Sequence, residues 1–116
     1  MPAPTSIAIT ASAVKRLVKE RQMYEKELVE QEKRVEHKQK QFDEEGNSKD
    51  ENAEYHLKQE KEALKQTQNI FPGLDSKISE TVEKLKTEIA AAERDESTAD
   101  EVSKAKEVLS TCDKTL

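Results

Sequence analysis

The sequence predicts an all-α protein, an elongated antiparallel three-helix bundle with coiled-coil-like packing. Three observations lead to this prediction. Ala, Glu, Lys, Leu and Arg supply half of the 116 residues, a composition typical of long helices and coiled coils. Only 2 glycines and 3 prolines interrupt the chain. The apolar residues recur at spacings of three and four, the period of helices that bury one face.

The same composition excludes several classes of protein. Charged residues make up 39% of the chain and aromatic residues 3%, and the net charge of −5 is small for this length. Because the apolar residues are periodic and self-repulsion is weak, we expect a folded bundle rather than a disordered chain. No apolar run approaches the roughly 18 residues of a membrane span, and no secretory leader is recognisable. We therefore expect no membrane association, no cofactor and no enzymatic activity.

The first predicted elements are a flexible arm over residues 1–9 and a helix over about 11–45. Thr10 is the expected N-cap, with Ile9 and Val14 as a hydrophobic staple. The seam of this helix consists of Val14, Leu17, Arg21, Tyr24, Leu28, Gln31, Val35, Lys38 and Phe42. The pair Gly46-Asn47 is expected to end the helix.

A second helix is expected over about 49–71, opened by the capping box Ser48-Lys-Asp-Glu51. Pro72-Gly73 is expected to stop it, because proline has no N–H and disfavours a helical residue before it. The seam of the second helix consists of Ala53, Leu57, Glu60, Leu64, Thr67 and Phe71.

A third helix is expected over about 75–94, with Ile78, Val82, Leu85, Ile89 and Ala92 on its buried face. The capping box Thr98-Ala-Asp-Glu101 then predicts a kinked continuation or a short fourth helix over 98–111. Short connections make the successive helices antiparallel neighbours within one domain over residues 10–112. Residues 113–116 are expected to form a frayed tail.

Five polar residues occupy seam positions, where burial would destabilise the bundle unless the side-chain tips find water or a partner. These residues are Arg21, Gln31, Lys38, Glu60 and Thr67. Two interpretations stay open. The long side chains reach solvent along a slender bundle and set its register, or some of them face a partner protein.

The chain shows no arrangement typical of catalysis or of metal binding. His37 and His56 lie on different predicted helices, far from any cysteine, so we expect ordinary surface histidines. Cys112 is the single cysteine, which is compatible with a reducing compartment and excludes an internal disulfide. We expect no catalytic, cofactor-binding or metal-binding residue.

Charge and exposure point to a protein partner instead. Lys15, Arg16, Lys19 and Arg21 form a basic cluster, too narrow and too poor in aromatic residues for nucleic-acid binding. A partner with an acidic surface fits it better. The candidate partner-binding residues are Lys15 from this cluster and, opposite the seam, Arg16, Lys19, Met23, Lys26 and Glu30, with Tyr55 on the outer face of the second helix. Met23 and Tyr55 are either ordinary surface residues or anchors for a partner.

Two segments of the first helix resemble a known family. Val14-Lys-Arg-Leu-Val-Lys-Glu20 and Met23-Tyr-Glu-Lys-Glu27 are similar to the opening of the first helix in the tubulin-specific chaperone A family, also called tubulin-binding cofactor A. The resemblance is strongest over residues 10–36. Elsewhere it rests on chain length, the predicted loop near 46–50 and the proline at 72.

The resemblance implies a non-catalytic chaperone. Members of the family capture β-tubulin after its release from the cytosolic chaperonin and hold it for the other cofactors that assemble the α/β heterodimer. It also implies a cytoplasmic, cytoskeleton-associated protein, as a monomer or a homodimer. The alternative function is a structural coiled-coil tether or an assembly subunit of another complex. The predicted breaks at 46–50 and 72–73 weigh against that alternative, because they divide the chain into short hairpins.

Overall fold

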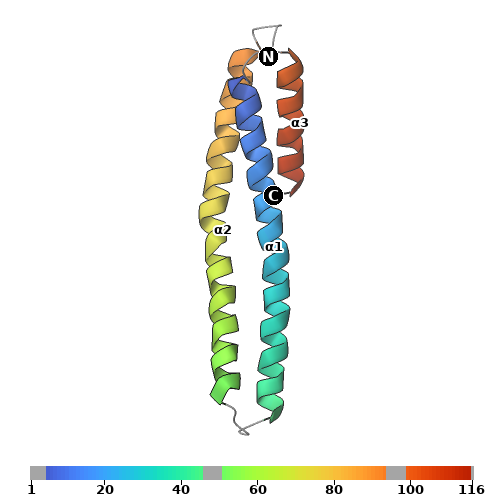
Figure 1. Cartoon of the computed structure of the whole chain (residues 1–116). Helices are drawn as coiled ribbons and strands as arrows, with labels where there is room; N and C mark the ends of the chain where they lie inside the picture. The colour runs from blue at the N-terminus through green and yellow to red at the C-terminus, as the bar shows by residue number, and fades with distance from the viewer. Residues whose placement is uncertain (1–4, 46–50, 94–98, 116) are drawn as a thin grey trace. The chain divides into compact units, whose positions relative to one another are not determined.

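The computed structural model describes residues 5–45, 51–93 and 99–115, which form three α-helices with no strand among them. Helix α1 spans Ser6–Glu45, α2 spans Glu51–Ala92 and α3 spans Ala99–Thr115 (Figure 1). The predicted all-α helical bundle is therefore confirmed. The chain divides into two compact units, one combining residues 1–21 with 73–116 and the other comprising residues 22–72.

The first unit contains the well-buried apolar core. It joins the start of α1, the second half of α2 and α3, with α1 and α2 antiparallel (Figure 1). Val14, Ile78 and Leu85 are at most 1% exposed, so the interior of this unit is closely packed. Its other buried apolar side chains are Ile7, Ala11, Leu17, Val18, Leu74, Ile89, Val102, Ala105 and Cys112.

The second unit pairs only two helical segments, from α1 and α2, and buries less. Among its described side chains only Leu57, Gln31 and Thr67 are buried, and two of these are polar. Leu28 and Leu64, predicted at the seam, are half-buried. Two helices shield one side of each seam, so these apolar side chains keep part of their surface in water.

The predicted seams are confirmed, because none of the seam positions predicted on residues 14–42, 53–71 and 78–92 is exposed in the structure. In α3, Val102 and Ala105 are buried and Leu109 is half-buried. Ala99, which was predicted on the same stripe, is exposed.

The start of α1 differs from the prediction. The helix begins at Ser6, and the hydroxyl of Thr5 accepts a hydrogen bond from the Ala8 backbone N–H at 3.2 Å, which makes Thr5 the N-cap. The predicted cap, Thr10, lies inside the helix and is buried. The buried stripe extends back to Ile7, so residues 6–9 of the expected arm are helical. Residues 1–4 lie outside the described residues.

The predicted stop at Pro72 is wrong. Helix α2 continues through it to Ala92, so the expected second and third helices are one helix. Proline 72 cannot donate to the carbonyl of residue 68, a local loss of about 3 kcal/mol or more in a helix interior. Phe71, Leu74 and Ile78 nevertheless continue the seam spacing across the proline. Burial of the seam residues on both sides of Pro72 therefore contributes more free energy than the lost hydrogen bond costs.

The predicted fourth segment is α3, which runs beyond residue 111 to Thr115, where the sequence predicted a frayed tail. No Gly or Pro stands after Cys112 to end the helix. The expected helix end at Gly46-Asn47, the capping residue Ser48 and the capping residue Thr98 lie outside the described residues.

Candidate partner-binding surface

Hydroxyl groups at the start of α1 bind carboxylates of the other two helices in the first unit. The Thr10 hydroxyl donates to Oε1 of Glu88 at 2.6 Å, and the Ser6 hydroxyl donates to Oε2 of the same side chain. The Thr5 hydroxyl donates to Oε2 of Glu101 at 2.7 Å. Burial alone would raise the pKa of Glu88, but these hydrogen bonds and nearby Lys84 outweigh it and lower the pKa.

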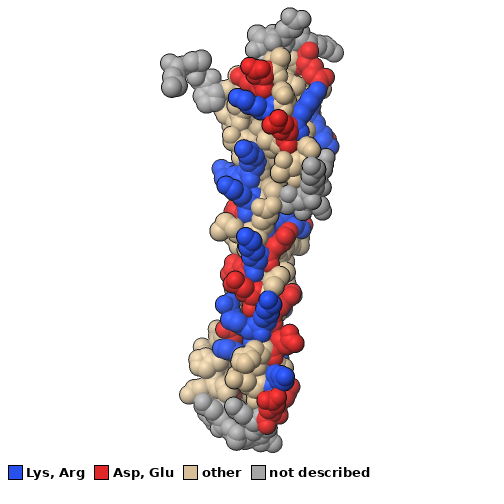
Figure 2. Space-filling view, turned by 90° about the vertical axis from the view of Figure 1, so that its right-hand side faces the viewer, with Lys and Arg blue, Asp and Glu red and all other residues tan. Residues whose placement is uncertain are grey.

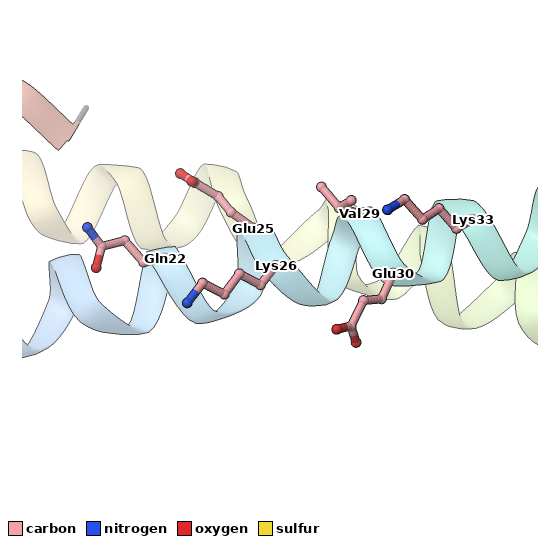
Figure 3. A pocket seen from close by; sticks show the side chains of 6 residues that line it. All are labelled: Gln22, Glu25, Lys26, Val29, Glu30 and Lys33. Atoms are coloured by element: carbon pink, nitrogen blue, oxygen red, sulfur yellow. The ribbon is translucent and has the colours of Figure 1, made fainter.

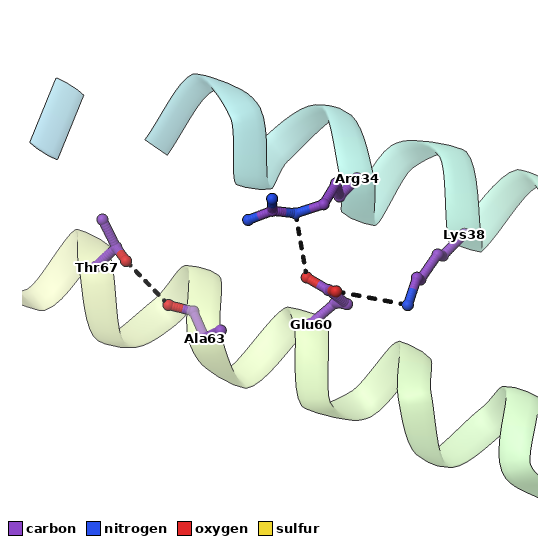
Figure 4. Close-up of polar contacts among 5 residues, drawn as sticks. All are labelled: Arg34, Lys38, Glu60, Ala63 and Thr67. Carbon is purple, nitrogen blue, oxygen red and sulfur yellow. Dashed lines mark hydrogen bonds and ion pairs between the residues drawn. The ribbon is translucent and has the colours of Figure 1, made fainter. Parts of the chain in front are cut away.

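In the second unit two polar seam residues, Lys38 and Glu60, form an ion pair between α1 and α2. Glu60 of α2 lies 3.7 Å from Nε of Arg34 and 3.5 Å from Nζ of Lys38, both on α1 (Figure 4). The Thr67 hydroxyl donates to the Ala63 carbonyl at 3.2 Å (Figure 4). The side-chain amide oxygen of Gln31 is buried and has no hydrogen-bond partner among the described residues.

Each of the five polar seam residues is buried or paired within the chain. Gln31 and Thr67 are buried, and Arg21 pairs with Asp75 of α2 at 2.6 Å. Lys38 and Glu60 pair with each other. The five seam residues thus meet partners or packing within the chain.

The candidates of the first unit, Lys15, Arg16 and Lys19, are all exposed. None of the three takes part in an ion pair with another described residue. Lys15 lines a groove between α1 and α3, and Arg16 lines a separate hollow on α1 beside Ile9. The fourth member of the predicted basic cluster, Arg21, is half-buried and paired with Asp75.

The candidates of the second unit are also exposed. Met23 is 70% exposed and Tyr55 is 59% exposed. The centroid of the Tyr55 ring lies 5.9 Å from that of the His56 ring, in an edge-on arrangement. Lys26 and Glu30 line a shallow hollow on α1, where they point away from the side that carries Val29 (Figure 3). All six residues that line this hollow come from one helix, so it is a shallow surface depression rather than an enclosed cavity.

Sequence reasoning missed two features of this surface. Ile9 was expected to serve as a staple but is 58% exposed. The groove between α1 and α3 was not predicted, because its α3 wall depends on where a third helix packs. One signal was present in the sequence: residues 1–14 carry no charge, in a chain of which 39% is charged.

The described residues show no sign of a metal site or of a membrane-spanning helix. In the part of the chain that the structure describes, no three His, Cys, Asp or Glu side chains lie close enough together to hold a metal ion. None of the described helices combines the length and apolarity needed to cross a bilayer. Acidic and basic side chains are interspersed along the face seen in Figure 2.

The comparison with protein families identifies the chain. A family model described as tubulin binding cofactor A matches residues 2–109. The chain belongs to the tubulin binding cofactor A family. Tubulin binding cofactor A proteins act as cofactors of tubulin folding, and the family is one of chaperones rather than of enzymes. No curated protein and no solved structure matched the chain in the corresponding comparisons.

Proposed function

We propose that this protein captures β-tubulin after its release from the cytosolic chaperonin and holds it for assembly of the α/β heterodimer. Membership of the tubulin binding cofactor A family supports a role in tubulin folding. The observation that carries the finer proposal is the group of exposed cations Lys15, Arg16 and Lys19, none of which is paired within the described residues. Cations without an internal partner are available to an acidic surface.

Contact of α1 with β-tubulin fits the physical task of a holding chaperone. A tubulin subunit without its partner exposes surface that the heterodimer covers, and such surface aggregates. A helical surface laid against it shields the apolar part, while the charged flanks keep the complex in solution. Polar contacts also limit affinity, so β-tubulin leaves without ATP hydrolysis when the next cofactor takes it.

The exposed side chains of the second unit belong to the same proposal as a further set of contacts. Met23 and Tyr55 supply adaptable and aromatic contact area, residue types enriched in the cores of interfaces. Lys26 and Glu30 supply charges of both signs beside Met23 on α1. The binding is proposed to take place in the cytoplasm, in association with the cytoskeleton, with the protein as a monomer or a homodimer.

Gel filtration with isolated β-tubulin tests the function. We expect the purified protein to form a complex with chaperonin-released β-tubulin and to bind the intact α/β heterodimer far more weakly. Failure of the wild-type protein to form that complex would contradict the proposal. Self-assembly into a larger helical complex without tubulin binding would instead support the alternative of a structural tether, which the family match does not favour.

A pair of double variants with equal charge change tests the surface. Arg16→Glu with Lys19→Glu is expected to weaken capture about tenfold or more, since both cations would then repel an acidic partner. The matched control is Lys61→Glu with Lys65→Glu, at two exposed lysines of α2. Circular dichroism should show the same helicity for both. Equal weakening by both pairs would mean that net charge, and not this surface, governs binding.

A further inference from the structure

A groove lies between α1 and α3 in the first unit, and its floor is apolar. Ala11 and Ala105 are buried at its base, while Ala8 and Val108 are half-buried beside them. Lys15 of α1 and Lys104 of α3 also line it, and both are exposed. Because the floor residues are small, another chain can approach the two helices closely here.

A second hollow, on α1, adjoins the groove. Ser12 and Ala8 line both depressions, and the second also includes Ile9 and Arg16. Ile9 is 58% exposed, so a large apolar side chain faces solvent in this second hollow. Together the two hollows form one surface that offers apolar contact at its centre and basic side chains around it.

The charges around this surface are mainly positive and unpaired. The cations that line the two hollows, Lys15, Arg16 and Lys104, form no ion pair with any described residue. The one carboxylate in the lining, Glu101, accepts a hydrogen bond from the Thr5 hydroxyl at 2.7 Å. The Glu101 carboxylate is thus hydrogen-bonded within its own chain, whereas the cations are available to bind another molecule.

We propose that this groove binds an acidic peptide segment of the protein partner, with an apolar side chain of that segment against the alanines and its carboxylates at Lys15 and Lys104. The inference rests on the proposed function, so the segment belongs to β-tubulin. Charge complementarity selects an acidic occupant over a basic one. Because the residues of the floor are small, a side chain that inserts between the two helices fits the groove better than a side chain that lies flat across it.

A bulky residue in the groove tests the proposal. Ser12→Trp fills the shared wall of both hollows, and we expect it to weaken β-tubulin capture about tenfold, as removal of a central interface contact does. The control is Ser103→Trp, at an exposed position of α3 that does not line the groove. Both sites are exposed, so circular dichroism should report unchanged helicity. The control should bind within about twofold of wild type.

Single charge reversals test the role of the two lysines. Lys15→Glu and Lys104→Glu should each weaken binding about fivefold or more, whereas Lys77→Glu, at an exposed lysine of α2 in the same unit, should not. Photocrosslinking from p-benzoylphenylalanine at position 12 then identifies the bound segment. We expect the crosslink to join a stretch of β-tubulin with net negative charge.

The outcomes separate the two proposals. A complex that forms equally well with Ser12→Trp, Lys15→Glu and Lys104→Glu would overturn the groove and leave tubulin capture in place. A crosslink to a basic or uncharged stretch would overturn it as well. Absence of any complex with the wild-type protein would overturn tubulin capture, and the groove's assignment with it.

Discussion

The guanidinium Nε of Arg21 lies 2.6 Å from Oδ1 of Asp75, an ion pair that joins α1 to α2 in the first unit. Asp75 stands three residues after Pro72, on the turn of α2 that follows the proline. Arg21 occupies a predicted seam position, where apolar residues are usual, and its side chain is 22% exposed. The contact accounts for a cation in the seam without a partner protein.

A double-mutant cycle measures this ion pair. Arg21→Ala, Asp75→Ala and the double variant should give a coupling free energy of about 0.5–1 kcal/mol in urea unfolding, because Asp75 is nearly half-exposed and screened by water. Addition of salt should reduce the coupling. A coupling of zero would show that solvent competes fully for both groups.

Gly73→Ala is expected to stabilise the protein by about 0.5–1 kcal/mol. Gly73 lies within helix α2, and a Cβ added there would meet no heavy atom within 4 Å apart from its chain neighbours and the adjacent helix backbone. Alanine therefore lowers the entropy of the unfolded chain at no steric cost. Thermal unfolding measures the effect. A decrease in the melting temperature would contradict the helical geometry at this residue.

Glu88 should make the protein sensitive to acid. Its pKa is lower in the folded state than its ordinary value of 4.5, so the ionised carboxylate stabilises the fold above that value. This contribution is lost as the pH falls from 4.5 through the lower folded-state pKa. Urea unfolding across this range should show a smaller acid-induced loss for Glu88→Gln than for wild type.

The control for the acid effect is Glu80→Gln, at an exposed glutamate of the same helix with no hydrogen bond among the described residues. It should lose stability with acid as wild type does. If Glu88→Gln also followed the wild-type curve, the hydroxyl groups of Ser6 and Thr10 would not be stabilising the carboxylate.

Gln31→Met should raise stability by about 1 kcal/mol, because the buried amide oxygen of Gln31 has no partner among the described residues. Methionine has a similar length and no group that requires a hydrogen bond. The control is Gln41→Met, at an exposed position on the same helix. Chemical unfolding that shows no gain at position 31 would indicate that water satisfies the oxygen.

Aspartate at two seam leucines should have unequal effects. Leu85 is 0% exposed, so Leu85→Asp buries a charge and should destabilise the first unit by about 4 kcal/mol or more, enough to unfold it. The heptad pattern alone predicts the same outcome for Leu28→Asp. Leu28 is half-buried, however, and the variant should keep its helicity with a loss of about 1–2 kcal/mol. Circular dichroism on heating distinguishes the two.

The candidate surface was predictable only in part. The exposure of Lys15, Arg16 and Lys19 followed from helical spacing, because positions opposite a buried seam point to water. Spacing could not predict the groove, because its second wall comes from α3, whose placement depends on tertiary packing. Val18 illustrates the same limit: it lies outside the predicted seam, yet it is buried in the first unit.

The period of the apolar residues by itself determined the helical class and the buried face of each helix, because helix geometry places residues three and four apart on one side. Tertiary structure decided where the helices begin and end. Thr5 caps α1 because the stripe from Ile7 to Val14 has a core to pack against. Helix α2 passes Pro72 because Phe71, Leu74 and Ile78 continue one seam. A local sequence signal such as Pro72 reports only the free energy lost at the break itself. Burial of apolar side chains on both sides of Pro72 contributes more free energy than the break removes.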